Sequence, residues 1–194
     1  DLLALPKEGR LYVWDESAGT GNRAVVVSTA PSASNFMFVS QQDRHVICLG
    51  THGVASGFDP MLVRWSDQND YTNWNVNVSS TSGENQLGDG SELITGLNTR
   101  NQSLIWTDNA VHAMEFVGPP FIFNFRQLGS NCGIAGQHAA IELDGRIFWM
   151  GAKDFFVYDG AVKALPCTVR RYVYNDFNFD QKEKVYAGTN QEFR

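Results

Sequence analysis

The recurrence of tryptophan constrains the fold of this 194-residue chain more than any other feature. Four of the five tryptophans close short runs of apolar and β-forming residues, at residues 11–14, 62–65, 103–106 and 146–149. Successive members of this set, Trp14, Trp65, Trp106 and Trp149, are 51, 41 and 43 residues apart. Blades of a β-propeller recur about every 40–50 residues, because each blade is one four-stranded unit. The spacing therefore predicts a series of blade-like units.

Short strands joined by tight turns are expected between the tryptophans. Asp144-Gly145 separates two apolar runs, and Asp-Gly is a strong hairpin signal because both central residues take a positive φ. Residues 72–78 are expected to form a further strand, in the blade-like unit that contains Trp65. No segment keeps apolar residues at helical spacing over three turns, so helix is expected to be nearly absent. The predicted fold class is all-β, with antiparallel four-stranded blades like those of a β-propeller, and a β-sandwich is the alternative.

The whole chain, residues 1–194, is expected to form part of one β-propeller domain. Approximate blades are expected at residues 11–35, 36–78, 92–128 and 138–174, and residues 182–194 are expected to start a further unit. Each blade leaves an apolar face that only a neighbouring blade can cover. Since the chain begins at Asp1 and ends just after a strand-like run, we expect an excerpt whose incomplete propeller is completed by sequence outside it.

Composition excludes several classes of protein. Apolar residues make up 43% of the chain and charged residues 19%, which fits a packed core and argues against a disordered tail. The 15 basic and 21 acidic residues give a net charge of −6, which argues against a protein that grips nucleic-acid phosphates. No run of 18 apolar residues occurs, so no membrane anchor is expected.

Catalytic and cofactor motifs are not found in the sequence. The Gly-Lys pair of a phosphate-binding loop, a zinc-protease motif and a nucleophile elbow are all absent. Three widely spaced cysteines, Cys48, Cys132 and Cys167, fit neither a disulfide framework nor a zinc site. Cys132 has His138 six residues on, but the glycines around it favour a turn between blades over a thiol nucleophile. We therefore expect no enzyme, no catalytic residues, no cofactor and no metal ion.

Four carboxylates in turn-like segments are the candidates for glycan cleavage, which needs a pair of them on either side of the scissile bond. They are Asp67, Asp70, Asp89 and Glu92. Residues 66–74 are similar to the Asp-box turn of sialidase-type propellers, but Asn73 separates Thr72 from Trp74 and the glycine of that turn is missing. We therefore expect Asp67 and Asp70 to cap a turn.

Histidines and a stripe of phenylalanines are expected to be structural. The histidines are scattered along the chain, at His45, His52, His112 and His138. His112 alternates with apolar residues on an expected strand, which favours a packed or surface position over a ligand role. Phe121, Phe123 and Phe125 occupy every second position, and a period of two is typical of the buried face of a strand.

Several segments resemble proteins of tailed-bacteriophage virions, and together they cover roughly residues 36–190. They are similar to the β-propeller part of a short-tailed bacteriophage tail nozzle or tail-hub protein, of the kind also called a tail tubular or packaged-DNA-stabilisation protein. These segments are residues 59–68 with Trp74, residues 90–94, Val117-Gly118-Pro119-Pro120-Phe121, residues 155–160 and residues 165–169.

The resemblance implies a structural protein of the viral tail that acts by assembly. Its partners would be further copies in a homo-oligomeric, hexameric ring, adaptor and portal-side proteins, and tail fibres. The ring would form a conduit for retention and ejection of genomic DNA without sequence-specific binding. A net charge of −8 over residues 1–160 suits repulsive guidance of DNA, although the same charge also keeps a protein soluble. A tail-associated glycan-active enzyme and a receptor-binding propeller are the alternatives.

Overall fold

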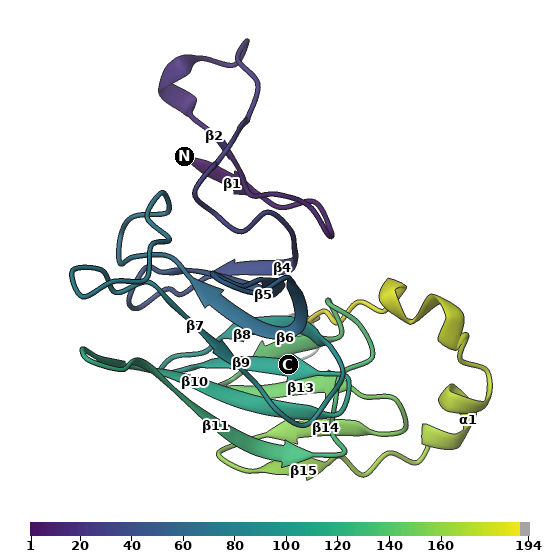
Figure 1. Ribbon diagram of the computed structural model, residues 1–194. Helices are drawn as coiled ribbons and strands as arrows, with labels where there is room; N and C mark the ends of the chain where they lie inside the picture. Colours follow the sequence, from purple (N-terminus) through teal and green to yellow (C-terminus); the bar gives the residue numbers. More distant parts are fainter. Residues whose placement is uncertain (191–194) are drawn as a thin grey trace. The chain divides into compact units, whose positions relative to one another are not determined.

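Four antiparallel sheets make up most of the fold (Figure 1). The computed structural model describes residues 1–190, and each sheet pairs its strands in chain order, every strand with the next. Strands hold 44% of the chain and helices 8%, so the predicted all-β class is confirmed. Four-stranded meanders with short turns are blade-like.

The first sheet has three strands and the other sheets have four each. The first sheet consists of β1 (Leu2–Ala4), β2 (Tyr12–Trp14) and β3 (Val25–Val26). The second consists of β4 (Ser34–Val39), β5 (Val46–His52), β6 (Phe58–Trp65) and β7 (Gly83–Gln86). The third consists of β8 (Leu93–Asn98), β9 (Ser103–Thr107), β10 (Ala110–Gly118) and β11 (Ile122–Ser130). The fourth consists of β12 (Ala140–Leu143), β13 (Arg146–Met150), β14 (Phe155–Tyr158) and β15 (Val162–Ala164). The helices of residues 1–190 are short: η1 (Glu16–Ala18), α1 (Arg170–Asn175) and η2 (Phe179–Lys184).

The sheets depart from the expected blade limits toward both ends of the chain. The first sheet begins at Leu2 rather than near residue 11, and residues 165–174 contain most of α1 and no strand. The unit expected from residue 182 does not start as a strand, because η2 runs to Lys184 and Tyr186 makes only an isolated parallel bridge with His138. The last part of that expected unit, residues 191–194, lies outside the described residues.

The strand expected at residues 72–78 is wrong, and side-chain hydrogen bonds give the reason. Asp70 accepts from the backbone N–H of Thr72 at 2.8 Å, and Asn77 accepts from that of Ser79 at 2.8 Å. Short polar side chains that bond the nearby backbone compete with sheet pairing. The segment is therefore an irregular loop, and the fourth strand of the second sheet is β7, which pairs with β6.

The chain divides into two compact units. The first unit holds Asp1–Gly88 together with Phe116–Phe123. The second unit holds Asp89–Glu115 together with the chain from Asn124 onward. The tip of the hairpin formed by β10 and β11 belongs to the first of these units.

The core of the second unit lies between the third and fourth sheets. Leu104 and Trp106 on β9 pack with Ile147 and Trp149 on β13, and all four side chains are buried. The two indole rings meet edge to face, with centroids 5.6 Å apart and an interplanar angle of 67°. This geometry stabilises an aromatic pair beyond the area that it buries. The indole N–H of Trp149 also donates to the carbonyl of Cys132 at 2.8 Å.

The tryptophan recurrence marks the same strand in three of the sheets. Trp14, Trp106 and Trp149 lie on the second strands β2, β9 and β13, whereas Trp65 lies on the third strand β6. The indole N–H of Trp65 donates to the carbonyl of Thr81 at 2.8 Å. On the second strand of its sheet, β5, the buried Cys48 packs in one cluster with Trp74 from the loop after β6.

Removal of either facing indole should destabilise the second unit. We expect Trp106→Ala and Trp149→Ala each to lower the free energy of unfolding by about 3–5 kcal/mol, because a buried ring is lost and a cavity remains. Trp14→Ala is the control, since Trp14 is only half-buried and its loss should have a smaller effect. Urea unfolding followed by circular dichroism measures the three variants, and equal stabilities would contradict the role assigned to the indole pair.

Candidate functional site

A buried histidine in the first unit lies at the centre of a polar network. His45 is fully buried, with its Nδ1 3.0 Å from Oδ2 of Asp43 and its Nε2 3.0 Å from Oγ1 of Thr81. The Thr81 hydroxyl in turn donates to Oδ1 of Asp67 at 2.6 Å. The order of carboxylate, imidazole and hydroxyl is that of a hydrolytic triad, so its chemistry needs to be examined.

The His45 network fastens the fold and is not arranged to activate a nucleophile. The single hydroxyl proton of Thr81 is donated to the Asp67 carboxylate, which leaves none for His45 to accept. Phe116 and Phe123 close over the imidazole, with ring centroids at 5.7 and 5.0 Å from it. Burial is the largest single effect on the pKa of Asp43 and acts to raise this pKa. The hydrogen bonds to the carboxylate, of which the one with His45 is the strongest, together outweigh burial, so the pKa is lowered. The network joins β5, the loop after β6 and the hairpin tip.

Asp67 organises the loop after β6, in agreement with the turn role predicted from the sequence. Its carboxylate accepts from the backbone N–H and the hydroxyl of Thr81 at 2.8 and 2.6 Å. It also accepts from the N–H of Gln68 and the amide of Asn73, both at 2.9 Å. Burial acts to raise the pKa of Asp67, but these hydrogen bonds together lower it below its usual value.

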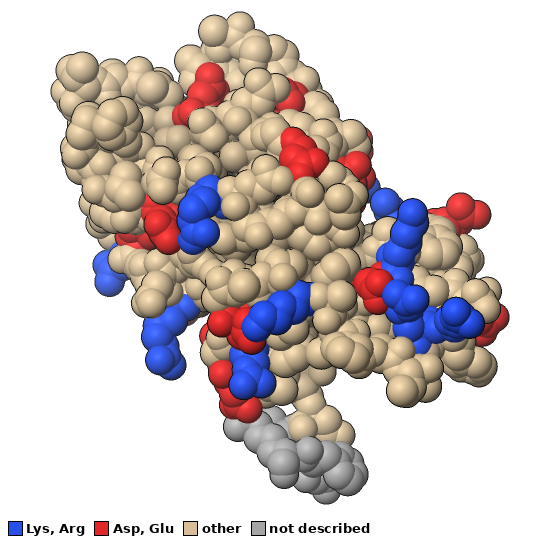
Figure 2. All heavy atoms as spheres, turned by 90° about the horizontal axis from the view of Figure 1, so that it is seen from below, with Lys and Arg blue, Asp and Glu red and all other residues tan. Residues whose placement is uncertain are grey.

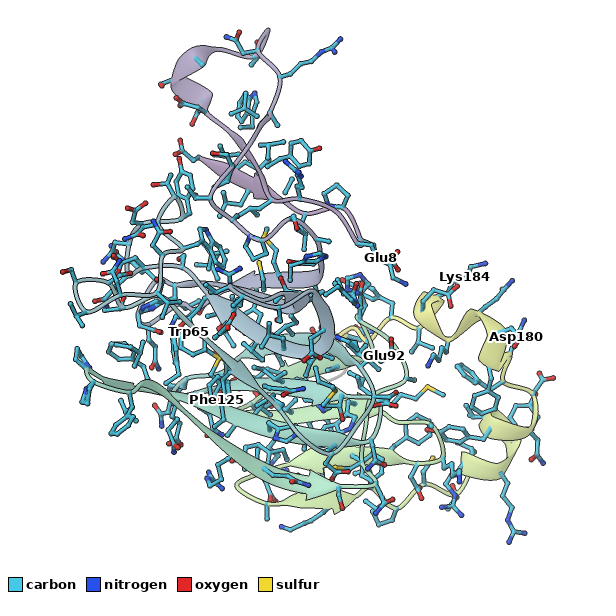
Figure 3. All side chains as sticks on the ribbon, in the orientation of Figure 1. Glu8, Trp65, Glu92, Phe125, Asp180 and Lys184 are labelled. Atoms are coloured by element: carbon cyan, nitrogen blue, oxygen red, sulfur yellow. The ribbon has the colours of Figure 1, made fainter. Side chains whose placement is uncertain are left out.

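The four carboxylates considered for glycan cleavage are divided between the two units. Asp67 and Asp70 belong to the first unit, and Asp89 and Glu92 belong to the second. Asp89 accepts from the side-chain amides of Asn109 at 2.5 Å and Gln127 at 2.6 Å. Glu92 is exposed just before β8 (Figure 3). No single unit therefore gathers all four.

Cys132 has the environment of a structural thiol. It is 2% exposed, and burial raises the pKa of its thiol to about 11, whereas a reactive thiol needs a lowered pKa. Cys132 lies in the segment that joins β11 to β12, and the N–H groups of Cys132 and Gly133 both donate to the carbonyl of Asn109, at 2.9 and 3.0 Å. A Cβ on Gly133 would lie 2.2 Å from the carbonyl oxygen of Asp108, so this close approach requires glycine. His138 instead lies beside Tyr186, with ring centroids 5.7 Å apart.

The phenylalanine stripe is only partly buried, which corrects the sequence-based prediction. Phe123 is buried and Phe125 half-buried, but Phe121 is 79% exposed. The cause is Ile122, whose φ of 56° breaks the alternation of side chains at the first residue of β11. His112 on β10 is buried, as expected for a packed histidine.

The tip of the β10–β11 hairpin is an exposed apolar feature of the first unit. Phe121 and Val117 are 79% and 53% exposed. Residues 116–125 contain no charged side chain. The sequence signal for this exposure is Pro119-Pro120 directly before Phe121, which places that ring in the turn rather than in the strand.

The outer face of the fourth sheet, meaning the face that points away from the third sheet, is also apolar across its first three strands. Ile141, Phe148 and Val157 are in register across β12, β13 and β14, and they alternate with the side chains that form the core of the unit. All three are half-buried. The chain near residue 187 runs beside the start of this sheet, where the N–H of Ala187 donates to the carbonyl of His138 at 2.8 Å.

A cavity of about 240 Å³ opens on this outer face. It is bounded by strands of the fourth sheet and by the segment that follows η2, and we call it the outer-face cavity. Its lining includes Ile141, Phe148, Phe155, Leu165, Val185 and Tyr186. No charged residue lines it in the part of the chain that the structure describes.

A polar cavity of about 320 Å³ lies elsewhere in the second unit, where the turn after β9 meets the segment before β14. Its lining includes Asp108, Asn109, Asn131, Lys153, Asp154 and Phe156. Both carboxylates are engaged: Asp108 accepts from Oγ of Ser91 at 2.6 Å, and Asp154 binds Arg170 at 2.6 Å. Burial acts to raise the pKa of Asp108, but the hydrogen bonds from Ser91 outweigh it and lower the pKa, which is unsuited to a general acid.

Comparisons with known proteins add no assignment to these surfaces. No protein-family model matches the sequence, and no curated protein matches it. Within residues 1–190, no group of three or more His, Cys, Asp or Glu side chains is placed to hold a metal ion. No helix of that range has the length and apolar character needed to cross a membrane. The candidate sites therefore rest on the geometry of the two apolar features and the polar cavity.

Loss of the Asp67 charge should weaken the first unit and change its response to acid. Asp67→Asn is expected to lower the free energy of unfolding by about 1–3 kcal/mol near pH 7, because hydrogen bonds to a charged acceptor are lost. Folding lowers the pKa of Asp67, so its stabilisation is present above the unfolded value of about 3.9 and disappears as the pH falls through the lower folded value. Wild type and variant should therefore converge in stability at low pH.

Urea unfolding between neutral pH and about pH 2 tests this expectation. Asp70→Asn is the matched control, since Asp70 lies in the same loop and accepts two hydrogen bonds, both from Thr72. It should have the smaller effect at neutral pH. A difference between wild type and Asp67→Asn that stays constant at every pH would show that the charge of Asp67 is not what stabilises the loop.

Proposed function

We propose that this chain is a structural component of a bacteriophage tail that works by assembling into a ring. The observation that carries the proposal is the half-buried apolar outer face of the fourth sheet, formed by Ile141, Phe148 and Val157. In a blade-like stack each sheet covers its neighbour, so a sheet with an apolar outer face is suited to receive another protein surface. The third and fourth sheets already pack together through aromatic side chains in this way.

Surface charge supports a passive conduit for DNA. A channel must let DNA slide, whereas Lys and Arg side chains that are free to neutralise phosphates would retain it. Three basic groups of the second unit are paired with acidic ones: Lys163 with Asp159 at 3.0 Å, Arg170 with Asp154 at 2.6 Å, and Arg126 with Glu115 at 3.9 Å. Figure 2 likewise shows basic and acidic side chains next to one another on the face in view.

The likeness of several segments to nozzle and hub proteins supplies the biological setting of the proposal. A hexameric ring of this chain lies in the virion tail, between the adaptor on the portal side and the tail fibres. It encloses the exit path of the genome and helps to retain the DNA before ejection. Its work is done by subunit contacts and by the shape of the channel, with no bond made or broken.

Assembly is the property that tests this proposal. Sedimentation velocity of the purified chain between about 1 µM and 1 mM is expected to show a concentration-dependent change from monomer to a larger species. Negative-stain images of that species are expected to show closed rings with an axial hole. A chain that stays monomeric over the whole range would overturn the proposal.

A charge on the outer face should oppose assembly. Ile141→Glu is expected to raise the dissociation constant for assembly about tenfold, because the carboxylate would be buried without a partner. Glu8→Lys is the control, since Glu8 is exposed in a turn of the first unit (Figure 3) and the change also alters one charged position. Equal assembly of both variants would remove the outer face from the proposal.

The polar cavity of the second unit favours a second candidate function, the binding of a receptor glycan. Asn109, Asn131 and Lys153 line it together with Phe156. This combination suits the hydroxyl groups and the apolar ring face of a sugar. Because both carboxylates of the cavity are engaged, binding is favoured over cleavage.

A glycan array probed with the purified chain tests the second candidate. Lys153→Ala is expected to weaken any signal, and Lys182→Ala, an exposed lysine on η2, should leave it unchanged. An array without signal, or a signal that both variants retain, would exclude this cavity as the glycan site.

A further inference from the structure

The two exposed apolar features described above complement each other. The first is the hairpin tip, where Phe121 protrudes with 79% of its surface exposed. The second is the outer-face cavity on the fourth sheet. One is convex and the other concave, and both lack charged side chains.

Packing between aromatic rings holds the hairpin tip in place. Phe123, two residues after Phe121, packs edge-on against Trp65 with ring centroids 5.2 Å apart and against His45 at 5.0 Å. Phe116 on the opposite strand packs against Phe123 at 5.7 Å. These rings anchor both strands of the hairpin. The backbone that carries the exposed ring of Phe121 is therefore already ordered before any partner binds. A preordered group loses less conformational entropy when it binds.

The outer-face cavity has the size and chemistry to take an aromatic ring. Its volume is about 240 Å³. An apolar protein cavity of about 150 Å³ is large enough to bind benzene. The rings of Phe148, Phe155 and Tyr186 line the walls and can pack against an entering ring at the angles that aromatic groups prefer.

We propose that the hairpin tip of one copy inserts into the outer-face cavity of a second copy, with Phe121 as the anchor. This inference rests on the proposed function and specifies how neighbouring copies in the ring meet. The chain carries both halves of the contact at different places, so each copy donates a tip to one neighbour and accepts a tip from another. Such a heterologous contact closes into a ring when the rotation per copy allows it, and otherwise produces a filament.

Charge favours a second copy as the occupant of the cavity. Neither the tip nor the lining carries a charge, so the contact buries no unpaired ion. Two copies with a net charge of −6 each repel one another through solvent. Association through this contact should therefore strengthen as salt screens the repulsion, which is the opposite of what an ion-pair interface would show.

Sedimentation of single variants is the first test. Phe121→Ser is expected to raise the dissociation constant for self-association about tenfold, as the loss of a buried aromatic anchor does at interfaces. Tyr172→Ser is the matched control, because Tyr172 is 78% exposed and its loss removes a ring of equal exposure from a different place. Ala187→Trp, which fills the cavity from its rim, and Ile141→Glu should each weaken association as Phe121→Ser does. Circular dichroism confirms that each variant is folded.

Mixing of variants is the second and sharper test. Phe121→Ser keeps a cavity but has no tip ring, whereas Ile141→Glu keeps the tip but has a charged cavity. At a concentration between the dissociation constant of wild type and the higher one of the variants, each variant alone should be mostly monomeric. An equimolar mixture should then form a one-to-one heterodimer and nothing larger, because one intact contact remains. Fluorescent labels of two colours on the two variants measure this directly.

The outcomes separate this inference from the proposed function. If wild type forms rings and Phe121→Ser forms them equally well, the tip-in-cavity contact is wrong while assembly stands. The contact is also wrong if the mixture of variants stays monomeric although each variant is folded. If wild type is monomeric at every concentration and salt level, both the contact and the proposed assembly fail.

Discussion

The second unit depends on the contact between the indoles of Trp106 and Trp149. Strands of three to nine residues make sheets that are too small to be stable in isolation, because a single sheet leaves one apolar face in water. Facing sheets solve this problem by packing large rings against each other. The segment that joins the third and fourth sheets also stabilises this contact, because the carbonyl of Cys132 accepts a hydrogen bond from the indole N–H of Trp149. Gly133, the next residue, allows the segment to pass close to the backbone of Asp108. The first unit meets the same requirement differently, with Trp74 supplied by a loop.

Polar side chains shape the parts of the first unit that have no regular strands. Asp67, Thr81 and His45 form a continuous set of hydrogen bonds, and rings of the hairpin tip cover the imidazole. Such a network specifies one arrangement of its loops when every member has a partner. Its order of groups is like that of a hydrolytic triad, yet its proton donors and acceptors are used up internally. Geometry and hydrogen-bond direction therefore separate a structural network from a catalytic one where residue types alone do not.

Local signals in the sequence predicted much of the fold, and non-local ones did not. The turn at Asp144-Gly145 was predictable because positive φ at both residues, 51° and 74°, is a local preference of this pair. The exposure of Phe121 depends on the unusual φ of Ile122, which no alternation pattern encodes. The position of Trp65 on a third strand depends on where the chain places β4, upstream of it. The outer-face cavity was beyond sequence reasoning, because one wall comes from Val185 and Tyr186 and the other from Ile141 and Phe148, about forty residues earlier.

The hairpin of β10 and β11 has a further consequence, because the two compact units share it. Strand β10 runs to Gly118 and β11 begins at Ile122, and residues 116–123 at their joined ends belong to the first unit, where Phe123 packs against Trp65. One continuous hairpin thus supplies residues to both compact units. A protease that cuts in the turn at Pro119-Pro120 would divide the tip between its two strands while leaving every sheet its strands.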